Sequence, residues 1–474
     1  MDASIVRITN ISIRNFKNVV EGCLSLENPR KDYKASVVGI YGQNGSGKTS
    51  IVEALDLLKY VLCGRSVPLE FADYINADSD KATLSFEFRI LQESESIARF
   101  VSYQFSIKSV KNANQNAVDL NHNERKVVIF NEVLKCPILS DKQIKTGRLI
   151  DTSGEDGFSP VSKRHLLIGK NKKIVTNSLV AKKLAEESSR SFIFSKELLD
   201  IIHNNIETHK AEGNLDKELE FYFSIIKSIS NYGANSLFVV STSHTGLISL
   251  NTQPFMFKIS DGNYGSIMLP LDGPVEISEK VKNVVEKIIS NMNIVLKQLI
   301  PGLTVGVKDF GSLLLRNGSQ GNRIQFISYR DAKEIPLKYE SEGIKKIISI
   351  LQLLIVVYNQ PSITVAIDEL DSGVFEYLLG ELLRIITEKG KGQLIFTSHN
   401  LRPLETIDRG FIAFTTTNPN HRYIRMPNVK DNNNLRSFYY RDIMLGEHDE
   451  ELYKPTHNAE IALAFREAGE YSGS

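Results

Sequence analysis

Gly42-Gln43-Asn44-Gly45-Ser46-Gly47-Lys48-Thr49 is a glycine-rich octapeptide that ends in a lysine and a threonine. A short apolar run, 37–41, precedes it, and apolar residues at helical spacing, from Ile51 to Leu62, follow it. A glycine loop can arise by chance, but a strand before it and a helix after it are the context that a phosphate-binding loop requires. The sequence therefore predicts a nucleotide site at this loop.

The residue types in the loop suit a polyphosphate. Glycines let the backbone wrap closely around the phosphates and direct N–H groups at them, and the helix that follows adds its N-terminal dipole. We expect Lys48 to bridge the β- and γ-phosphates of ATP and Thr49 to ligate Mg²⁺. The other loop residues expected to contact the nucleotide are Gly42, Asn44, Gly45, Ser46, Gly47 and Ser50.

A second candidate lies far along the chain, where Asp368-Glu369 ends the apolar run 363–367. We expect Asp368 to hold the Mg²⁺ shell and Glu369 to orient and deprotonate the attacking water. The alternative is an ordinary acidic loop at a strand end. Two adjacent acids, together with the absence of an Asn-Lys-x-Asp motif, favour a hydrolytic ATPase over a small GTPase.

A third motif, Ser341-Glu342-Gly343-Ile344, precedes a long apolar helix. A serine hydroxyl, a glycine N–H and a helix N-terminus together form an anion site, although the same residues could be a plain helix cap. The motif stands about 25 residues before the Asp368-Glu369 pair, a spacing that favours the functional interpretation. Ser341 and Gly343 are therefore candidate nucleotide ligands.

His399 follows the apolar run 394–397. A histidine at the end of a core strand can hydrogen-bond the γ-phosphate, although a lone histidine is more often structural. We place His399 with Glu369 as a candidate catalytic residue. Asp371-Ser372-Gly373 follow the acidic pair and could cross a dimer interface.

Composition limits the other functions. The 474 residues carry a net charge of +1, from 57 basic and 56 acidic side chains, so there is no overall electrostatic footprint for nucleic acid or an anionic membrane. The basic stretch 142–190 could touch nucleic acid, but a solvated face is the simpler reading. The three cysteines have no metal-ligand spacing, and neither a secretory signal nor a long apolar run is present. We expect a cytoplasmic protein with no membrane partner.

The pattern of elements predicts an α/β fold. Apolar strands alternate with helices near the acidic pair, as in a parallel sheet, and residues 83–90, 98–108 and 126–134 alternate as an antiparallel patch. Residues 1–135 and 301–474 are expected to form the two parts of one ATPase domain. Residues 136–300 are expected to form an inserted, mainly helical lobe without long heptad-regular arms.

These motifs, in this order, resemble the ABC-type ATPases of the RecF/SMC/OLD superfamily, and the early Arg14-Asn15-Phe16-Lys17 matches as well. The resemblance covers about 1–135 and 300–474. It implies a P-loop ATPase with a mixed or parallel sheet core, with Arg14 and Asn15 against the base and sugar. It also implies head-to-tail dimers that sandwich two ATP molecules, in which Ser341 and Gly343 cap the partner's nucleotide. Glu342 departs from the Ser-Gly-Gly pattern of transporters.

At finer grain the chain looks like the compact ATPases of bacterial anti-phage systems. The stretches that carry this are Tyr339–Lys346, Ile367–Gly373 and Asp442–Glu447. Length and the short inserted lobe look most like the ATPase subunit of PARIS-type systems. That resemblance implies an oligomer of ATPase dimers, which holds a toprim-type effector nuclease inactive until a phage trigger protein releases it.

The sequence thus favours an ATP-hydrolysing, Mg²⁺-dependent, homo-oligomeric switch of an abortive-infection system. Three alternatives stay open: a RecF-type DNA-repair ATPase that clamps DNA, a Septu-type defence ATPase, and a scaffold that uses ATP without hydrolysing it. The identity of the trigger and effector, the subunit number, DNA binding and the role of 136–300 are not given by the sequence.

Overall fold

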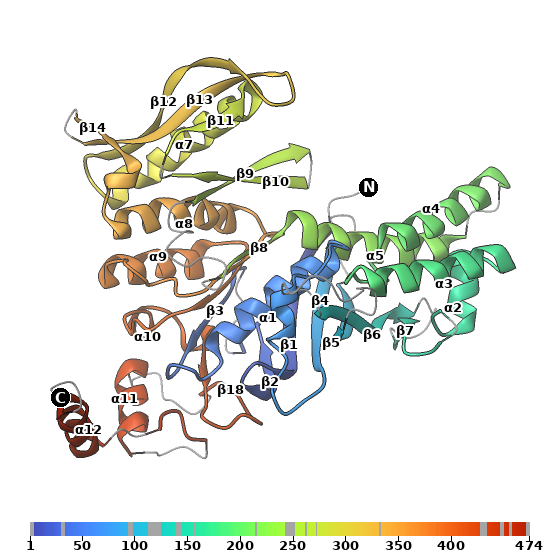
Figure 1. The fold of residues 1–474 in the computed structure, drawn as a ribbon, viewed down its shortest axis with the longest axis horizontal. Coiled ribbons are helices and arrows are strands. Elements are labelled where there is room, and N and C mark those ends of the chain that lie inside the picture. Colours follow the sequence, from blue (N-terminus) through green and yellow to red (C-terminus); the bar gives the residue numbers. More distant parts are fainter. Residues whose placement is uncertain are drawn as a thin grey trace.

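The computed structural model describes residues 4–29, 34–92, 98–111, 125–138, 145–155, 157–213, 216–241, 252–260, 263–271, 273–330, 333–426, 434–445, 450–454 and 457–470. Its centre is a six-stranded sheet of order β18-β17-β3-β16-β15-β8, in which only the β17–β18 pair is antiparallel (Figure 1). The strands are β3 (Ser36–Tyr41), β8 (Leu237–Val240), β15 (Thr364–Ile367), β16 (Gln393–Thr397), β17 (Ile412–Thr415) and β18 (Tyr423–Ile424).

The central strands are apolar throughout because both faces of this sheet are covered. Side chains of one face, such as Val38 and Ile395, join the core that surrounds helix α1 (Lys48–Leu62). Those of the other face, such as Val365 and Phe396, pack with helices α8 (Glu342–Asn359) and α9 (Glu376–Lys389). The short helix α10 (Pro403–Thr406) contacts α9 and α11 (Leu435–Leu445).

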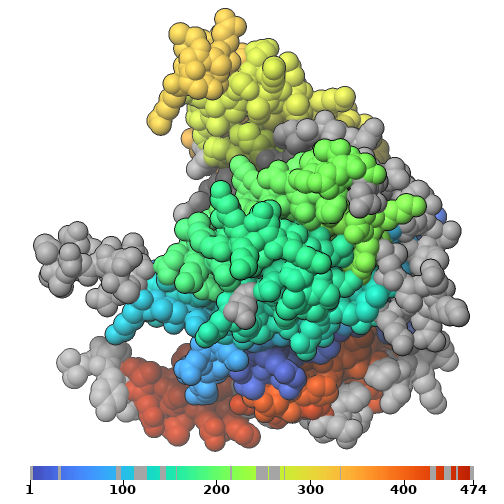
Figure 2. All heavy atoms as spheres, turned by 90° about the vertical axis from the view of Figure 1, so that its right-hand side faces the viewer, coloured from blue at the N-terminus to red at the C-terminus, as the bar shows by residue number. Residues whose placement is uncertain are grey.

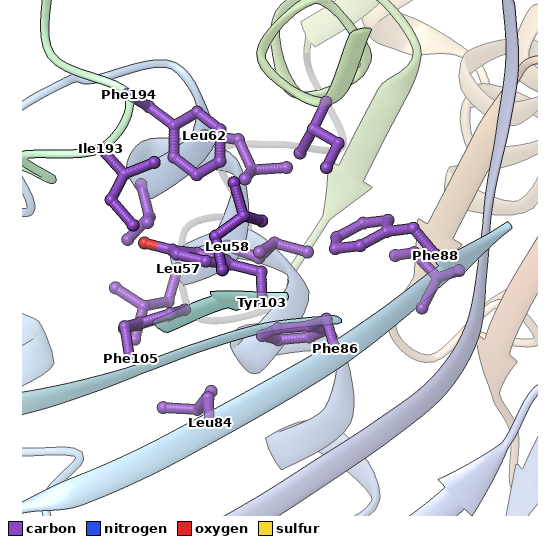
Figure 3. Packing of buried hydrophobic residues seen from close by; sticks show 14 of the residues in the cluster. Leu57, Leu58, Leu62, Leu84, Phe86, Phe88, Tyr103, Phe105, Ile193 and Phe194 are labelled. Carbon is purple, nitrogen blue, oxygen red and sulfur yellow. The ribbon is translucent and has the colours of Figure 1, made fainter. Parts of the chain in front are cut away.

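A second six-stranded sheet, antiparallel throughout, has the order β2-β1-β4-β5-β6-β7. Its strands are β1 (Ser4–Phe16), β2 (Val19–Ser25), β4 (Ala82–Gln92), β5 (Arg99–Lys111), β6 (Arg125–Ile138) and β7 (Lys145–Asp151). Leucines of α1 (Leu57, Leu58, Leu62) meet aromatic side chains of β4 and β5 in the core between the sheets (Figure 3). The predicted α/β class, with a mainly parallel core sheet and an antiparallel sheet beside it, is confirmed.

The segment 136–300 is distributed over three regions. Its first residues complete β6 and form β7 of the antiparallel sheet. Four helices then project from one side of the molecule, and the strand after them, β8, enters the central sheet beside β15 (Figure 1). They are α2 (Val161–Ile168), α3 (Lys172–Glu187), α4 (Lys196–Ala211) and α5 (Lys217–Asn235).

The helical region is joined to the antiparallel sheet by a buried carboxylate. Glu132 on β6 accepts hydrogen bonds from the Tyr103 and Ser191 hydroxyls at 2.9 and 2.6 Å and from the Phe192 N–H at 2.7 Å. Burial raises the pKa of Glu132, and these donors oppose the shift. The loop between α3 and α4 is therefore fixed against the sheet.

The last region lies over α8 (Figure 1). Helix α7 (Glu279–Leu299) packs there against a small antiparallel sheet of order β11-β13-β12, to which β14 adds, and against the hairpin β9–β10. The strands are β9 (Thr252–Ser260), β10 (Asn263–Pro270), β11 (Val275–Ser278), β12 (Leu303–Leu314), β13 (Gln320–Arg330) and β14 (Lys333–Pro336). Residues 242–251, between β8 and β9, lie outside the described residues.

Helix α12 (Asn458–Glu470) stands apart at the C-terminal end. The three cysteines, Cys23, Cys63 and Cys136, are unpaired. Within the described ranges, no helix is both long and apolar enough to cross a membrane.

Candidate nucleotide site

The glycine loop has the backbone geometry that its composition predicts. Gly42, Gly45 and Gly47 have φ angles of 154°, 75° and 91°, in the region that favours glycine. A Cβ at Gly42 would collide with the Thr415 hydroxyl, whereas nothing lies within 4 Å of a Cβ at Gly45. The loop is thus packed on one side and open on the other, where Asn44 and Gly45 are exposed.

Lys48 folds over this loop from the start of α1. Its ammonium donates to the carbonyl oxygens of Gly42 and Gln43 at 2.8 and 2.9 Å. Burial lowers the pKa of Lys48, while the negative charges of Asp368 and Glu369 raise it. The side chain is therefore a buried cation that the fold holds between the glycine loop and the acidic strand end. Ser50, two residues after Lys48 on α1, is also buried.

Asp368 and Thr49, the two predicted magnesium ligands, are brought together. The Thr49 hydroxyl donates to Asp368 Oδ1 at 3.3 Å, although the two residues are 319 positions apart in the sequence. Thr397, at the end of the neighbouring strand β16, donates to the same oxygen at 2.5 Å. Asp368 is almost fully buried. Parallel strands end at the same sheet edge, and this is why residues after β15 and β16 meet beside the glycine loop.

Glu369 has an unusual backbone. Its φ is 47°, a value uncommon outside glycine that costs on the order of 1 kcal/mol. Thr397 fixes this conformation, since its hydroxyl accepts from the Glu369 N–H at 2.8 Å and its carbonyl accepts from the Leu370 N–H at 3.0 Å. The Glu369 side chain is exposed, so it is directed away from the core while Asp368 is directed inward.

Asp371 holds the loop after β16, which contains His399 and Asn400. One carboxylate oxygen of Asp371 accepts from the backbone N–H groups of His399 and Asn400 at 3.0 and 2.9 Å. Its other oxygen is buried without a hydrogen-bond partner among the described residues. Asp371, which the sequence suggested for a dimer interface, therefore positions His399 within its own chain. The His399 side chain is exposed.

The Ser341 motif begins α8 and lies against the loop after the acidic pair. Ser341 is the N-cap, and its exposed hydroxyl accepts from the Ile344 N–H at 3.4 Å. A Cβ at Gly343 would collide with the carbonyl oxygen of Gly373. Glycine at 343 is thus required by close backbone packing, which couples the α8 N-terminus to the loop 371–373 that also holds His399.

Gly343→Ala is expected to destabilise the protein by about 1–3 kcal/mol, because a methyl group would force apart two backbone segments. The melting temperature measures this effect. Gly154→Ala is the control, since a Cβ there meets nothing within 4 Å. An unchanged melting temperature for Gly343→Ala would contradict the close approach to Gly373.

Lys346 is a site residue that sequence reasoning missed. It lies on the second turn of α8 and is only 8% exposed. Burial lowers its pKa, and the charges of Glu369, Asp371 and Asp368 oppose that shift. A second buried lysine thus interacts electrostatically with the same carboxylates as Lys48. The basic pair Lys345-Lys346 was visible in the sequence, but only the helix packing shows which lysine turns inward.

Contacts from the C-terminal part of the chain also hold the glycine loop, and no local sequence signal indicates them. The Ser46 and Thr415 hydroxyls hydrogen-bond, and the buried Tyr423 hydroxyl donates to the Gly47 carbonyl at 2.8 Å. Arg422 donates to the Asn18 carbonyl at 2.6 Å. The Asn18 side chain in turn donates to the Gly45 carbonyl, so the turn after β1 joins this support.

The predicted base-contacting residues lie at the end of β1, just before this turn. Arg14 pairs with Glu21 at 2.8 Å on the exposed sheet surface, and Asn15, with φ 55°, donates to the Ser79 hydroxyl at 3.1 Å. Lys17 binds both oxygens of the buried Glu53 carboxylate on α1 at 2.5 and 2.6 Å. The turn is therefore fixed to helix α1. The contact of Arg14 and Asn15 with a base stays a prediction.

The donor set fits Mg·ATP. The glycine cradle is shaped for close backbone approach, and a buried carboxylate beside a threonine hydroxyl offers the hard oxygen ligands that Mg²⁺ takes alongside phosphate oxygens. The described residues hold no cluster of three or more His, Cys, Asp or Glu side chains that could bind a metal unaided. Any Mg²⁺ held here would thus share its coordination with the nucleotide.

A glycine loop between β3 and α1, with two acids at the end of β15, is the arrangement of a P-loop ATPase fold. The chain belongs to the family described as "AAA domain, putative AbiEii toxin, Type IV TA system", whose model matches residues 37–405. No curated protein matches the chain.

Among solved structures, the chain is similar to the Smc head domain with an extended coiled coil from Pyrococcus furiosus, bound to the C-terminal domain of ScpA. The identity is 13%, with 89% of this chain and 96% of that chain covered and a TM-score of 0.40. The SMC head domain from Thermotoga maritima is 11% identical, with 89% of this chain and 99% of that chain covered and a TM-score of 0.35. The recombination mediator protein RecF with ATP is 14% identical, with 89% of this chain and 100% of that chain covered and a TM-score of 0.35.

Proposed function

We propose that this protein binds and hydrolyses ATP with Mg²⁺ and acts as the oligomeric switch of an anti-phage abortive-infection system. The observation that carries the ATPase proposal is the joint placement of Thr49, Asp368 and Glu369 beside the glycine loop. The family description, which names a toxin of a toxin–antitoxin system, supports the defence context. In this proposal the chain resembles the ATPase subunit of PARIS-type systems and restrains an effector nuclease of the toprim type until a phage protein triggers release.

Each residue has a distinct role in the proposed reaction. Lys48 and the loop N–H groups bind the phosphates, and Thr49 and Asp368 hold Mg²⁺, which when bound neutralises charge that develops on the phosphate oxygens. Glu369, directed outward from the strand end, accepts a proton from the attacking water. His399, held by Asp371, lies on the neighbouring loop, from which it would hydrogen-bond the γ-phosphate.

A second copy would complete the site. Ser341 and Glu342 are exposed at the N-terminus of α8, where backbone N–H groups and the helix dipole favour an anion. We propose that Ser341 and Gly343 contact the ATP of a partner subunit, in a dimer with two equivalent sites. Among the alternatives, a Septu-type system fits the same motifs, and the near-neutral net charge of +1 weighs against a DNA clamp.

Mixing two inactive variants tests the composite site. Ser341→Arg should leave ATP binding by one subunit intact but abolish turnover, and Lys48→Ala should fail to bind ATP. In a mixed dimer, one of the two sites combines the intact loop of one subunit with the intact Ser341 of the other. We therefore expect partial recovery of phosphate release when the two are mixed, relative to either protein alone.

The mixture is informative only if mixed dimers form, so differently tagged copies should be co-purified. Recovery in verified mixed dimers supports a shared site. If verified mixed dimers show no recovery at any ratio, each site is contained within one subunit and the proposed dimer is wrong.

A further inference from the structure

Helix α12 carries apolar side chains that no other described residue covers. Every residue from His457 to Gly469 is exposed. Ile461, Phe465 and Ala468 recur at the spacing of one helix face, and Phe465 is 77% exposed. Glu460 and Glu467 flank that face. A helix with an exposed apolar stripe gains little by remaining in water, so the stripe points to a docking partner.

The start of this segment is anchored to the body. The Lys454 N–H donates to the Gln43 side chain of the glycine loop at 3.1 Å, and Leu452 is 2% exposed. The Thr417 N–H donates to the Glu451 carbonyl at 2.7 Å. The residues up to Lys454, the last ones described before the start of this segment at 457, are therefore fixed beside the glycine loop.

Helix α3 carries the complementary surface. Its buried face packs through Ser178, Ala181 and Ala185, while Val180 and Leu184, one turn apart, are 51% and 49% exposed. Lysines 172, 173 and 183 are exposed on the same outer side of the helix. Glu187, which pairs with Lys126, is exposed on the same side, so the apolar pair is bordered by three lysines and one glutamate, whereas two glutamates lie beside the apolar side chains of α12. Helices α2 to α5 form the surface that faces the viewer in Figure 2.

The two helices of one molecule do not face each other. Helix α12 and helix α3 lie at opposite ends of the longest axis in Figure 1. A contact between them within one chain is therefore excluded by the fold, and the complementary surface must come from a second molecule.

We propose that α12 of one copy docks on α3 of another copy, with Ile461 and Phe465 against Val180 and Leu184 and the glutamates of α12 beside the lysines of α3. Because the two surfaces differ, the contact is heterologous and joins copies head to tail into a ring or a chain. This contact is separate from the ATP-dependent dimer proposed above and needs no nucleotide. One short helix buries little area, so the pairwise contact is expected to be weak.

Sedimentation of full-length, nucleotide-free protein over a concentration series tests the proposal. The wild type should assemble at high concentration, and Phe465→Ser should raise the concentration of half-assembly by at least about tenfold. Leu463→Ser is the matched control, because Leu463 is 53% exposed on the opposite face of the same helix and should leave assembly unchanged. Unchanged melting temperatures are expected for both variants, since α12 is exposed.

A charge exchange makes the test specific for the pair of helices. Glu460→Lys with Glu467→Lys should weaken assembly, as should Lys172→Glu with Lys183→Glu, and combining all four in one chain should restore it. Three results would each overturn the proposal: a wild type that stays monomeric, a Phe465→Ser variant that assembles like the wild type, or a variant with all four charge substitutions whose assembly is not restored. In those cases α12 serves a different partner, such as the effector, or none.

Discussion

The Glu369→Gln variant is expected to bind Mg·ATP like the wild type and to lose ATP turnover by at least about a hundredfold. Glutamine keeps the shape of the side chain but cannot accept the proton of the attacking water. The strained backbone at this position is held through Thr397, which the change leaves in place. Lys48, Thr49 and Asp368 still hold the nucleotide. Phosphate release and a direct ATP titration, made side by side, measure the two quantities separately.

Glu376→Gln is a suitable control, because Glu376 is an exposed glutamate a few residues further along the chain, in the first turn of α9. We expect it to leave turnover unchanged. If Glu369→Gln retains full turnover, Glu369 is not the general base and must have a different role in the site.

The same variant addresses the proposed switch in cells. Without hydrolysis, ATP stays bound and stabilises the dimer that encloses it, because ATP has a higher affinity for that state than for the open one. Glu369→Gln should therefore still co-purify with the effector nuclease but fail to protect cells in a phage plating assay. Full protection would show that hydrolysis is not part of the trigger and that ATP acts as a structural ligand.

The local parts of the fold were predictable because they depend on local physics. A glycine loop needs glycines at φ angles that other residues avoid, and β3, β15 and β16 must be apolar because both sheet faces are buried. The strand-end position of Asp368 and Glu369 follows from the same pattern. The roles of these side chains, and of Ser341, Gly343 and His399, stay predictions that the experiments above address.

The long-range contacts were not predictable from one sequence. Nothing near Thr415, Arg422 or Tyr423 indicates that this segment supports the glycine loop, because the contacts depend on β17 pairing with β3. The entry of β8 into the central sheet has the same cause: a four-residue apolar run carries no information about its neighbour. The inward turn of Lys346 depends on how α8 packs.

The Lys48→Ala variant is expected to weaken ATP binding by at least tenfold, which corresponds to about 1.4 kcal/mol or more. In the absence of nucleotide, the Lys48 ammonium donates to two loop carbonyls, and its removal takes away one of the two buried positive charges that offset the nearby acids. A triply or quadruply charged nucleotide would then enter a site whose acids repel it. Lys454→Ala is the matched control, because the Lys454 side chain is exposed beside the loop and only its backbone N–H contacts Gln43.

The pH dependence gives Lys48→Ala a second readout. Burial lowers the pKa of Lys48, so the free protein loses this positive charge at a lower pH than an exposed lysine does. ATP affinity should therefore fall as the pH rises through that lowered pKa, and the fall should be absent in Lys48→Ala. Titrations at neutral and alkaline pH, with melting temperatures to verify folding, measure both effects. Equal affinities for Lys48→Ala and the wild type at neutral pH would remove the glycine loop from the proposed site.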